Sequence, residues 1–307
     1  MKFFIPNSVI DRYSFRARGK LLLENMANNH GYINDYQLIK NTNELYIIGK
    51  EFDHAVIQHC NENKINYVMD ISDFKFYKNS MLELYKKATE NCKAIVTTCD
   101  YLADEIKKIF DKPSIVIEDP TERKQIKPNK KIFTKHDNIK IVIYGARKNI
   151  RPINFENLKE QLFKVHQNIQ LKIITNKTIE DPIEWIDWSF ELQEKLVQES
   201  DFILLPIAYT EKKKAFLKSK GNNRPIDGIQ QGKFVITNDT IPSYVDLNNF
   251  IWTGDIAEGL KYAIDNPNEV VQKITLGQQH INKYYTPSRI VKKWLDLESK
   301  ILNETSL

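Results

Sequence analysis

The sequence predicts an α/β protein with two doubly wound, parallel-sheet domains. Short apolar runs alternate with longer amphipathic segments along the 307 residues, as expected when strands and helices follow one another. Several runs are uninterrupted Ile, Val and Phe, which is typical of strands buried on both faces of a parallel sheet. The alternation breaks once, near the middle. Because a domain averages about 150 residues, we expect one domain on each side of the break.

The first half contains strand candidates wherever apolar residues cluster, and the segments between them have helical periodicity. Helices are expected at 15–28, 80–91 and 101–110, with 98–100 as the N-cap of the last. The strand candidates are 2–6, 45–48, 66–70, 94–98 and 114–118.

The second half follows a polar, basic stretch from Pro120 to Asn138 with two prolines, which favours a linker between domains. Helices are expected at 155–166 and from about 288 to the C-terminal end of the chain. The strand candidates are 139–144, 171–175, 202–205 and 234–237. We therefore expect a first domain at 1–125, a linker at 126–138, a second domain at 139–285 and a final helical segment at 286–307.

Composition excludes several classes of protein. The chain has 10 glycines and neither G-x-G-x-x-G nor G-x-x-x-x-G-K-[ST], so any phosphate must be bound by side chains and isolated glycines. Three cysteines without C-x-x-C spacing favour a reducing compartment over disulfides or structural zinc. No apolar run predicts a signal peptide or a transmembrane helix. The net charge of +5, without interleaved basic and aromatic residues, argues against nucleic-acid binding.

Polar side chains that follow the predicted strands are candidate functional residues, because ligands of open α/β sheets bind beyond the carboxyl ends of the strands. After the first strand, Arg16 and Arg18 can gather around an anion, although a solvated basic turn fits the segment equally well. Asp70 and Asp73, at and after the strand 66–70, are candidates for a general base or a sugar ligand. A helix N-cap is the commoner role for an aspartate in this position.

Cations also follow the first strand of the second half. Gly145, directly after 139–144, permits close approach of the backbone, and Arg147, Lys148 and Arg151 supply positive charge. A diphosphate requires such fixed donors to compensate its negative charges.

The stretch 218–237 is the most informative part of the chain. It reads as a basic loop, a short helix that begins near Asn223, and a further strand. Lys220 and Arg224 would lie beside the helix N-terminus, which itself attracts anions. Asp227, one turn into the helix, could accept hydrogen bonds from two ribose hydroxyls. These features predict a nucleotide-diphosphate site, and a basic surface loop before an ordinary helix is the alternative.

Segments spread over most of the chain resemble glycosyltransferases of the GT-B fold, in particular the group 1, family 4-like type of bacterial surface-glycan synthesis. The resemblance implies two Rossmann-like domains that face a cleft, with the acceptor on the first, the nucleotide sugar on the second, and a C-terminal helix that crosses back to the first. The similar segments are Phe15–Gly19, Tyr67–Asp73, Val96–Leu102, Ile115–Pro120, Ile183–Ser189, Asp201–Pro206, Asn223–Asp227 and Gly232–Thr237.

The resemblance also implies roles for individual residues. In retaining members, two acidic residues with seven others between them flank the donor loop. Asp227 matches the second, whereas Ser219 stands where the first belongs, so the choice between inversion and retention stays open. The residues expected to act in catalysis are Asp70, Asp73 and Arg147; those expected to bind the donor are Gly145, Lys148, Lys220, Asn223, Arg224 and Asp227; and those expected on the acceptor or phosphate side are Arg16 and Arg18.

The sequence therefore predicts a metal-independent glycosyltransferase, without a cofactor, that moves a sugar from a nucleotide-diphosphate donor to a glycan or lipid-linked acceptor. The resemblance implies polysaccharide or lipopolysaccharide assembly in the bacterial cytoplasm and allows peripheral contact with the inner membrane. Ser219 favours an alternative, a non-catalytic GT-B-like partner subunit that binds a nucleotide or glycan. A sugar-nucleotide epimerase on the same fold is a third reading. No metal site is expected, because His54 and His59 lack a matching second pair.

Overall fold

The computed structural model describes residues 1–5, 15–26, 30–49, 52, 54–76, 78–176, 185–209 and 214–304. The chain divides into two compact units. The first unit comprises Met1–Glu122, Lys212–Asn222 and Lys283–Leu307, and the second comprises Arg123–Glu211 and Asn223–Asn282. The divisions fall at 122 and 282, whereas the sequence predicts domain boundaries at 125 and 285. Residues 214–222 belong with the first unit, although they follow the second unit's strand β10 (Phe202–Leu204) in the chain.

Each unit is built on a six-stranded sheet in which all strand pairs are parallel. The first sheet has the order β2 (Gly31–Ile33), β1 (Lys2–Phe4), β3 (Leu45–Ile48), β4 (Asn66–Ile71), β5 (Ala94–Thr97) and β6 (Ile115–Val116). The second has the order β12 (Trp252–Thr253), β11 (Phe234–Thr237), β10 (Phe202–Leu204), β7 (Ile139–Tyr144), β8 (Ile169–Thr175) and β9 (Trp185–Asp187). Two Rossmann-like units are thus confirmed.

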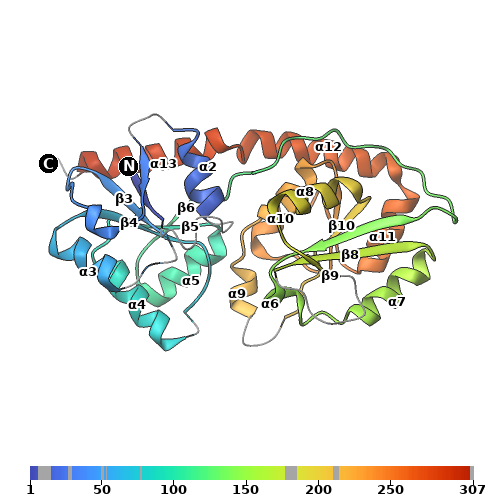
Figure 1. Cartoon of the computed structure of the whole chain (residues 1–307), viewed down its shortest axis with the longest axis horizontal. Helices are drawn as coiled ribbons and strands as arrows, with labels where there is room; N and C mark the ends of the chain where they lie inside the picture. The colour runs from blue at the N-terminus through green and yellow to red at the C-terminus, as the bar shows by residue number, and fades with distance from the viewer. Residues whose placement is uncertain are drawn as a thin grey trace. The chain divides into compact units, whose positions relative to one another are not determined.

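Helices connect the parallel strands (Figure 1). In the first unit they are α2 (Leu21–Leu23), α3 (His54–Glu62), α4 (Asn79–Glu90), α5 (Asp100–Phe110), α9 (Lys214–Lys218) and α13 (Pro287–Glu304). In the second they are α6 (Arg147–Ile150), α7 (Phe155–Val165), α8 (Phe190–Glu199), α10 (Asn223–Gln230) and α11 (Ile256–Asp265), and α12 (Pro267–Tyr284) leads back to the first. Short 3₁₀ turns occupy Tyr36–Leu38 and Pro242–Leu247.

Apolar runs place the core of the first unit on both faces of its sheet. Along β3, Leu45 and Ile47 pack in one cluster, whereas Tyr46 and Ile48 pack in the other. This division follows from the two-residue repeat of a strand, in which neighbouring side chains point to opposite faces. Because both faces are covered, the strand has no polar positions, as the sequence analysis assumed.

The C-terminal helix α13 covers one face of the first sheet and contacts α2 (Figure 1). Ile290, Trp294 and Ile301 recur on one side of this helix and join the cluster that contains Phe3. Trp294 is fully buried, and its ring meets that of Phe3 edge to face with centroids 5.8 Å apart. The expectation that the last helix packs on the first domain is therefore confirmed.

Two local expectations are met only in part. The segment expected to be one helix at 15–28 forms a π-helical turn at Arg16–Lys20 followed by the single turn α2, and residues 27 and 28 lie outside the described part. A Cβ on Gly19 would lie 2.5 Å from Ile5 Cδ1, so this wide turn brings the backbone unusually close to β1. At α5, the N-cap is Cys99, whose side chain makes no capping hydrogen bond.

Candidate functional site

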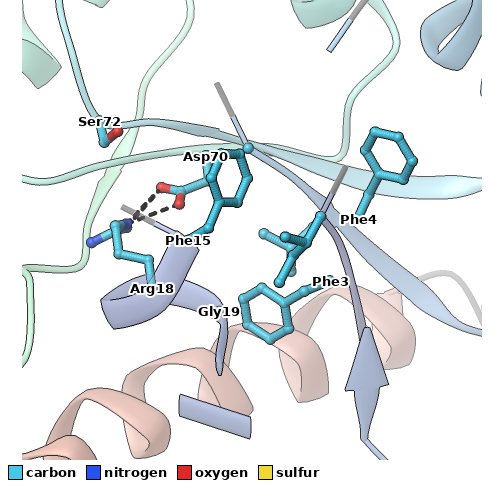
Figure 2. Close-up of a pocket in the computed structure, with 10 residues that line it drawn as sticks. Phe3, Phe4, Phe15, Arg18, Gly19, Asp70 and Ser72 are labelled. Atoms are coloured by element: carbon cyan, nitrogen blue, oxygen red, sulfur yellow. Dashed lines mark hydrogen bonds and ion pairs between the residues drawn. The ribbon is translucent and has the colours of Figure 1, made fainter. Parts of the chain in front are cut away.

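Arg18 lies at the centre of the polar groups at the carboxyl edge of the first sheet. Its Nη2 and Nε donate to the two carboxylate oxygens of Asp70 at 2.7 and 2.8 Å. Its Nη1 donates to Asp119 Oδ1 at 3.1 Å and to the Ile117 carbonyl at 2.7 Å. Figure 2 shows the guanidinium and the Asp70 carboxylate pointing toward each other. We call Arg18, Asp70 and Asp119 the Arg18 cluster.

The Arg18 cluster is buried, with its residues between 3% and 6% exposed. Burial would lower the pKa of Arg18, but the charges and hydrogen bonds of Asp70 and Asp119 outweigh it and raise the pKa above its usual value. The guanidinium also lies 5.7 Å from the ring centre of Trp294. A cavity of about 20 Å³, large enough for one water molecule, adjoins the pair beside Ser72 (Figure 2).

Lys220 pairs with Asp73 at the same edge of the first unit, at 2.6 Å. The neighbouring Ser219 is fully buried, and its hydroxyl accepts a hydrogen bond from the Phe74 N–H at 3.1 Å and donates to the Phe216 carbonyl at 2.9 Å. A Cβ on Gly221 would lie 2.7 Å from Asp119 Oδ2. The segment that follows α9 is therefore closely packed on the ends of β4 and β6.

Arg16 is paired as well. Its Nε and Nη2 donate to the two carboxylate oxygens of Glu122 at 2.7 and 2.8 Å. The predicted basic residues Arg16, Arg18 and Lys220 therefore each contact a carboxylate within the first unit. Such pairs position the chain, and they reduce the positive charge available to an incoming anion.

The second unit places Arg224 over the end of β7. Arg224 Nη1 lies 3.5 Å from the Tyr144 carbonyl, and the Tyr144 hydroxyl donates to the Arg224 carbonyl at 2.9 Å. A Cβ on Gly145 would lie 3.2 Å from Arg224 Nη1, so the glycine keeps the guanidinium close to the backbone. Burial and then the charge of Asp227 raise the pKa of Tyr144, against the opposing effect of Arg224.

Asp227 is held one turn into α10 and is 4% exposed. The next residue, Gly228, allows this helix to lie on the sheet, because a Cβ there would be 2.8 Å from both Ile203 and Val235. Asn223 begins the helix, as the sequence analysis expected. The helix therefore brings Asn223, Arg224 and Asp227 to the carboxyl edge of the second sheet.

Arg147 and Lys148 belong to α6, the short helix after Gly145. The Arg147 backbone N–H donates to Asn176 Oδ1 at 3.0 Å. Among the described residues, neither the Arg147 nor the Arg224 guanidinium has a carboxylate within ion-pair distance. The second unit thus presents, near Gly145, two arginines without a carboxylate partner in the part of the chain that the structure describes.

The structure brings most of the predicted donor residues together in the second unit, but it places Lys220 with Asp73 in the first. Sequence reasoning missed Asp119, Tyr144 and Trp294. Asp119 follows the last strand of the first half, where an acidic residue could have been noted by the rule that selected Asp70. Trp294 carries no such signal, because its contact with Arg18 depends on how α13 packs.

No group of three or more His, Cys, Asp or Glu side chains within the described ranges is arranged to hold a metal ion. His59, one of the two histidines considered, lies 2.7 Å from the Ile39 carbonyl through Nε2. No helix in the described part of the chain is long and apolar enough to cross a membrane.

Solved structures with a similar fold include a glycosyltransferase from Rickettsia africae, at 11% identity and a TM-score of 0.63, with 98% of each chain covered. The fold is that of the GT-B glycosyltransferases. Anabaena HepE in complex with UDP shares this GT-B fold at 8% identity and a TM-score of 0.62, covering 86% of this chain and 81% of that one. The structure of the pneumococcal O-GlcNAc transferase GtfA, in complex with UDP and GlcNAc, matches at 10% identity and a TM-score of 0.60. The match covers 87% of this chain.

The chain spans just over half of some relatives of the GT-B fold, 58% of the pneumococcal transferase and 57% of TarM from S. aureus. No protein-family model and no curated protein sequence matches it. At these identities the similarity defines the fold, and chemistry has to be argued from the residues.

Proposed function

We propose that the protein is a glycosyltransferase that moves a sugar from a nucleoside-diphosphate donor to a glycan or lipid-linked acceptor. The observation that carries the proposal is the pair Arg147 and Arg224 beside Gly145, which lack carboxylate partners among the described residues. A cation that is fixed by the backbone and not neutralised by the protein is suited to bind an anion. We call Gly145, Arg147, Lys148, Arg224 and Asp227, with Asn223, the donor half-site.

In the donor half-site, Arg147, Lys148 and Arg224 bind the diphosphate, and Asp227 accepts hydrogen bonds from the ribose. When the bond from the sugar to the β-phosphate breaks, negative charge accumulates on the departing diphosphate. Prepositioned cations stabilise this charge more than they stabilise the intact donor, and removing one such group typically costs about 100- to 1000-fold in turnover. In this mechanism the arginines and the lysine supply that stabilisation without a metal ion.

The first unit binds the acceptor. Of the two predicted bases, Asp73 is the better candidate, because Asp70 has both oxygens engaged by a buried guanidinium. A guanidinium keeps its proton at any physiological pH, whereas the Lys220 amine on Asp73 sits on a flexible stem. Asp70 then acts as a positioning residue that keeps Arg18 and the end of β4 in place.

The test is release of nucleotide from a panel of UDP- and GDP-sugars with a metal chelator present, and a CMP-sugar, which has only one phosphate, serves as the control. UDP-sugars come first, because HepE and GtfA are complexes with UDP. We expect one donor to bind and to be hydrolysed slowly or transferred, with activity retained under chelation. Absence of binding by every donor would contradict the proposal, and loss of activity only on chelation would contradict the role of the cations.

A non-catalytic partner subunit is the second candidate, and buried Ser219 favours it. The side chain at this position is enclosed by hydrogen bonds to Phe74 and Phe216, so no acidic group is available there. Calorimetry separates the candidates: tight nucleotide-sugar binding with no turnover on any glycan or lipid-linked acceptor supports the subunit.

For the enzyme, we propose bacterial surface polysaccharide or lipopolysaccharide assembly, in the cytoplasm or at the inner face of the membrane. Radiolabelled sugar transferred into a lipid extract, and not into water-soluble glycans, would identify a lipid-linked acceptor. Sedimentation of the protein with anionic vesicles tests the membrane contact.

A further inference from the structure

A cavity of about 460 Å³ lies at the amino ends of strands β10 and β11 in the second unit. Its lining includes the residues just before these strands, whereas the donor half-site follows the carboxyl end of β7 and the start of α10. The cavity therefore lies at the opposite edge of the second sheet from the donor half-site. Its volume falls within the range of about 300 to 1000 Å³ that is typical of small-molecule sites.

Lys233 provides the cavity with a positive charge. Its Nζ donates to the Gln198 and Ser200 carbonyls at 2.8 and 2.6 Å, and no described carboxylate lies within ion-pair distance of it. The nearby Asp201 is engaged by Lys131 at 2.8 Å and by the Lys140 N–H at 2.8 Å. A lysine ammonium has three donors, so one remains for a ligand.

Part of the Lys233 contact is structural, because these two carbonyls lie at the C-terminal end of α8, where lysines commonly cap helices. Capping does not supply a counter-charge, however. Burial lowers the pKa of Lys233, against the opposing charge of Asp201, so the ammonium carries a desolvation cost. An anion in the cavity would remove that cost.

The remaining walls are mixed: Lys127, Asn129 and Glu199 are among the polar residues that line the cavity, and one side is apolar and suits the body of an amphiphile. Val270, Val271 and Ile274 of α12 form one side, and the aromatic ring of Phe133 lies on another. Gln231 also lines the cavity, and its buried side-chain oxygen accepts no hydrogen bond from the described residues. A ligand with an anionic head, an apolar body and one hydrogen-bond donor satisfies all three features.

We propose that this cavity is a second ligand site, separate from the donor half-site, that binds a small amphiphilic anion, with Lys233 at the anionic head and α12 at the apolar body. The ligand would act on the second unit from the amino ends of its strands, as an effector and not as a reactant.

The probe for the test is 8-anilinonaphthalene-1-sulfonate, which combines a sulfonate, an N–H and aromatic rings. We expect saturable fluorescence at one site on the folded protein, weakened at least about tenfold in Lys233→Gln, which corresponds to about 1.4 kcal/mol. Because this variant also loses a helix cap, Val271→Trp provides the independent test, since it fills the cavity and leaves the cap intact. Lys107→Gln on α5 is the charge-matched control.

Urea unfolding of each variant verifies that the fold is retained before binding is compared. Undiminished probe binding in both Lys233→Gln and Val271→Trp would overturn the proposal, as would complete displacement of the probe by UDP, which would assign the probe to the donor half-site. Retained probe binding alongside absent nucleotide binding would support the cavity and contradict only the proposed function.

Discussion

The two units use their arginines in different ways. In the first unit, Arg18 is buried between Asp70 and Asp119, and Arg16 is paired with Glu122. In the second, Arg147 and Arg224 lie near the end of a strand without a carboxylate partner among the described residues. The same residue type in the same topological position therefore stabilises one unit and provides the other with a place for an anion. Their partners, and not their positions, distinguish the two roles.

The largest effect is expected when the Arg18 cluster loses its cation. Arg18→Met removes the buried cation that contacts Asp70 and Asp119, which costs about 3 to 5 kcal/mol in the free energy of unfolding. Arg224→Met removes no ion pair to a described residue and should cost about 1 kcal/mol or less. Hydrogen exchange measured by mass spectrometry would locate the loss in peptides of β4 and α13. Equal destabilisation by the two substitutions would break the comparison.

For nucleotide binding, an arginine substitution in the second unit should have a larger effect than one in the first unit, which reverses the ranking for stability. Arg224→Ala removes a cation that the protein does not neutralise, so the affinity for UDP or the best donor should fall about 10- to 100-fold, or roughly 1.4 to 2.7 kcal/mol. Arg16→Ala, whose guanidinium is occupied by Glu122, serves as the matched control and should leave the affinity unchanged. Isothermal titration calorimetry measures both, and a larger loss in Arg16→Ala would reverse our assignment of the half-sites.

Substitution of Gly221 in the first unit and of Gly145 in the second provides a further comparison of the two units. A Cβ on Gly221 would meet the Asp119 carboxylate at 2.7 Å, and this carboxylate is fixed by Arg18, so Gly221→Ala should destabilise the first unit by about 1 to 3 kcal/mol. A Cβ on Gly145 would meet the tip of Arg224 at 3.2 Å, which can move, and the Ile150 side chain at 3.4 Å, which is an ordinary van der Waals contact. Gly145→Ala should therefore leave stability nearly unchanged and weaken nucleotide binding. Thermal unfolding ranks the two variants by stability, and titration with nucleotide ranks them by affinity. A loss of stability confined to Gly145→Ala would contradict the expected rankings.

The sequence was sufficient to predict the two parallel sheets, because buried strands such as 45–48 and 202–205 are continuous hydrophobic runs. Strands β2, β9 and β12 were missed, since edge strands of two or three residues leave no periodic pattern. The start of α10 at Asn223 was predicted from residue types alone. Which cations are neutralised was not, because the Lys220–Asp73 pair joins residues 147 positions apart, and only the packing of the segment after α9 brings them together.

The smallest expected effect is the change in the free energy of unfolding at alkaline pH. The two units should differ in this change, because all three cysteines lie in the first unit. Burial raises the pKa of the Cys99 thiol to about 11 from its ordinary value of 9. The folded protein therefore keeps this proton where the unfolded chain releases it, and stability falls as pH rises from 9 toward 11, by at most about 1.4 kcal/mol per pH unit for one thiol.

For Lys233 in the second unit, the change of stability with pH has the opposite sign. Its pKa is lowered by burial, so its contribution to stability increases with pH until the unfolded lysine also loses its proton near 10.5.

Urea unfolding at pH 8 and at pH 10 should show a smaller loss of stability in Cys99→Ser than in the parent protein, because the serine hydroxyl does not ionise in this range. Equal losses in the two proteins would show that the Cys99 thiol is already ionised, or already exposed, in the folded first unit. The buried packing of Cys99 against the Ser219 carbonyl, which lies 3.9 Å from its sulfur, would then be wrong, and with it the position of the segment that carries Lys220.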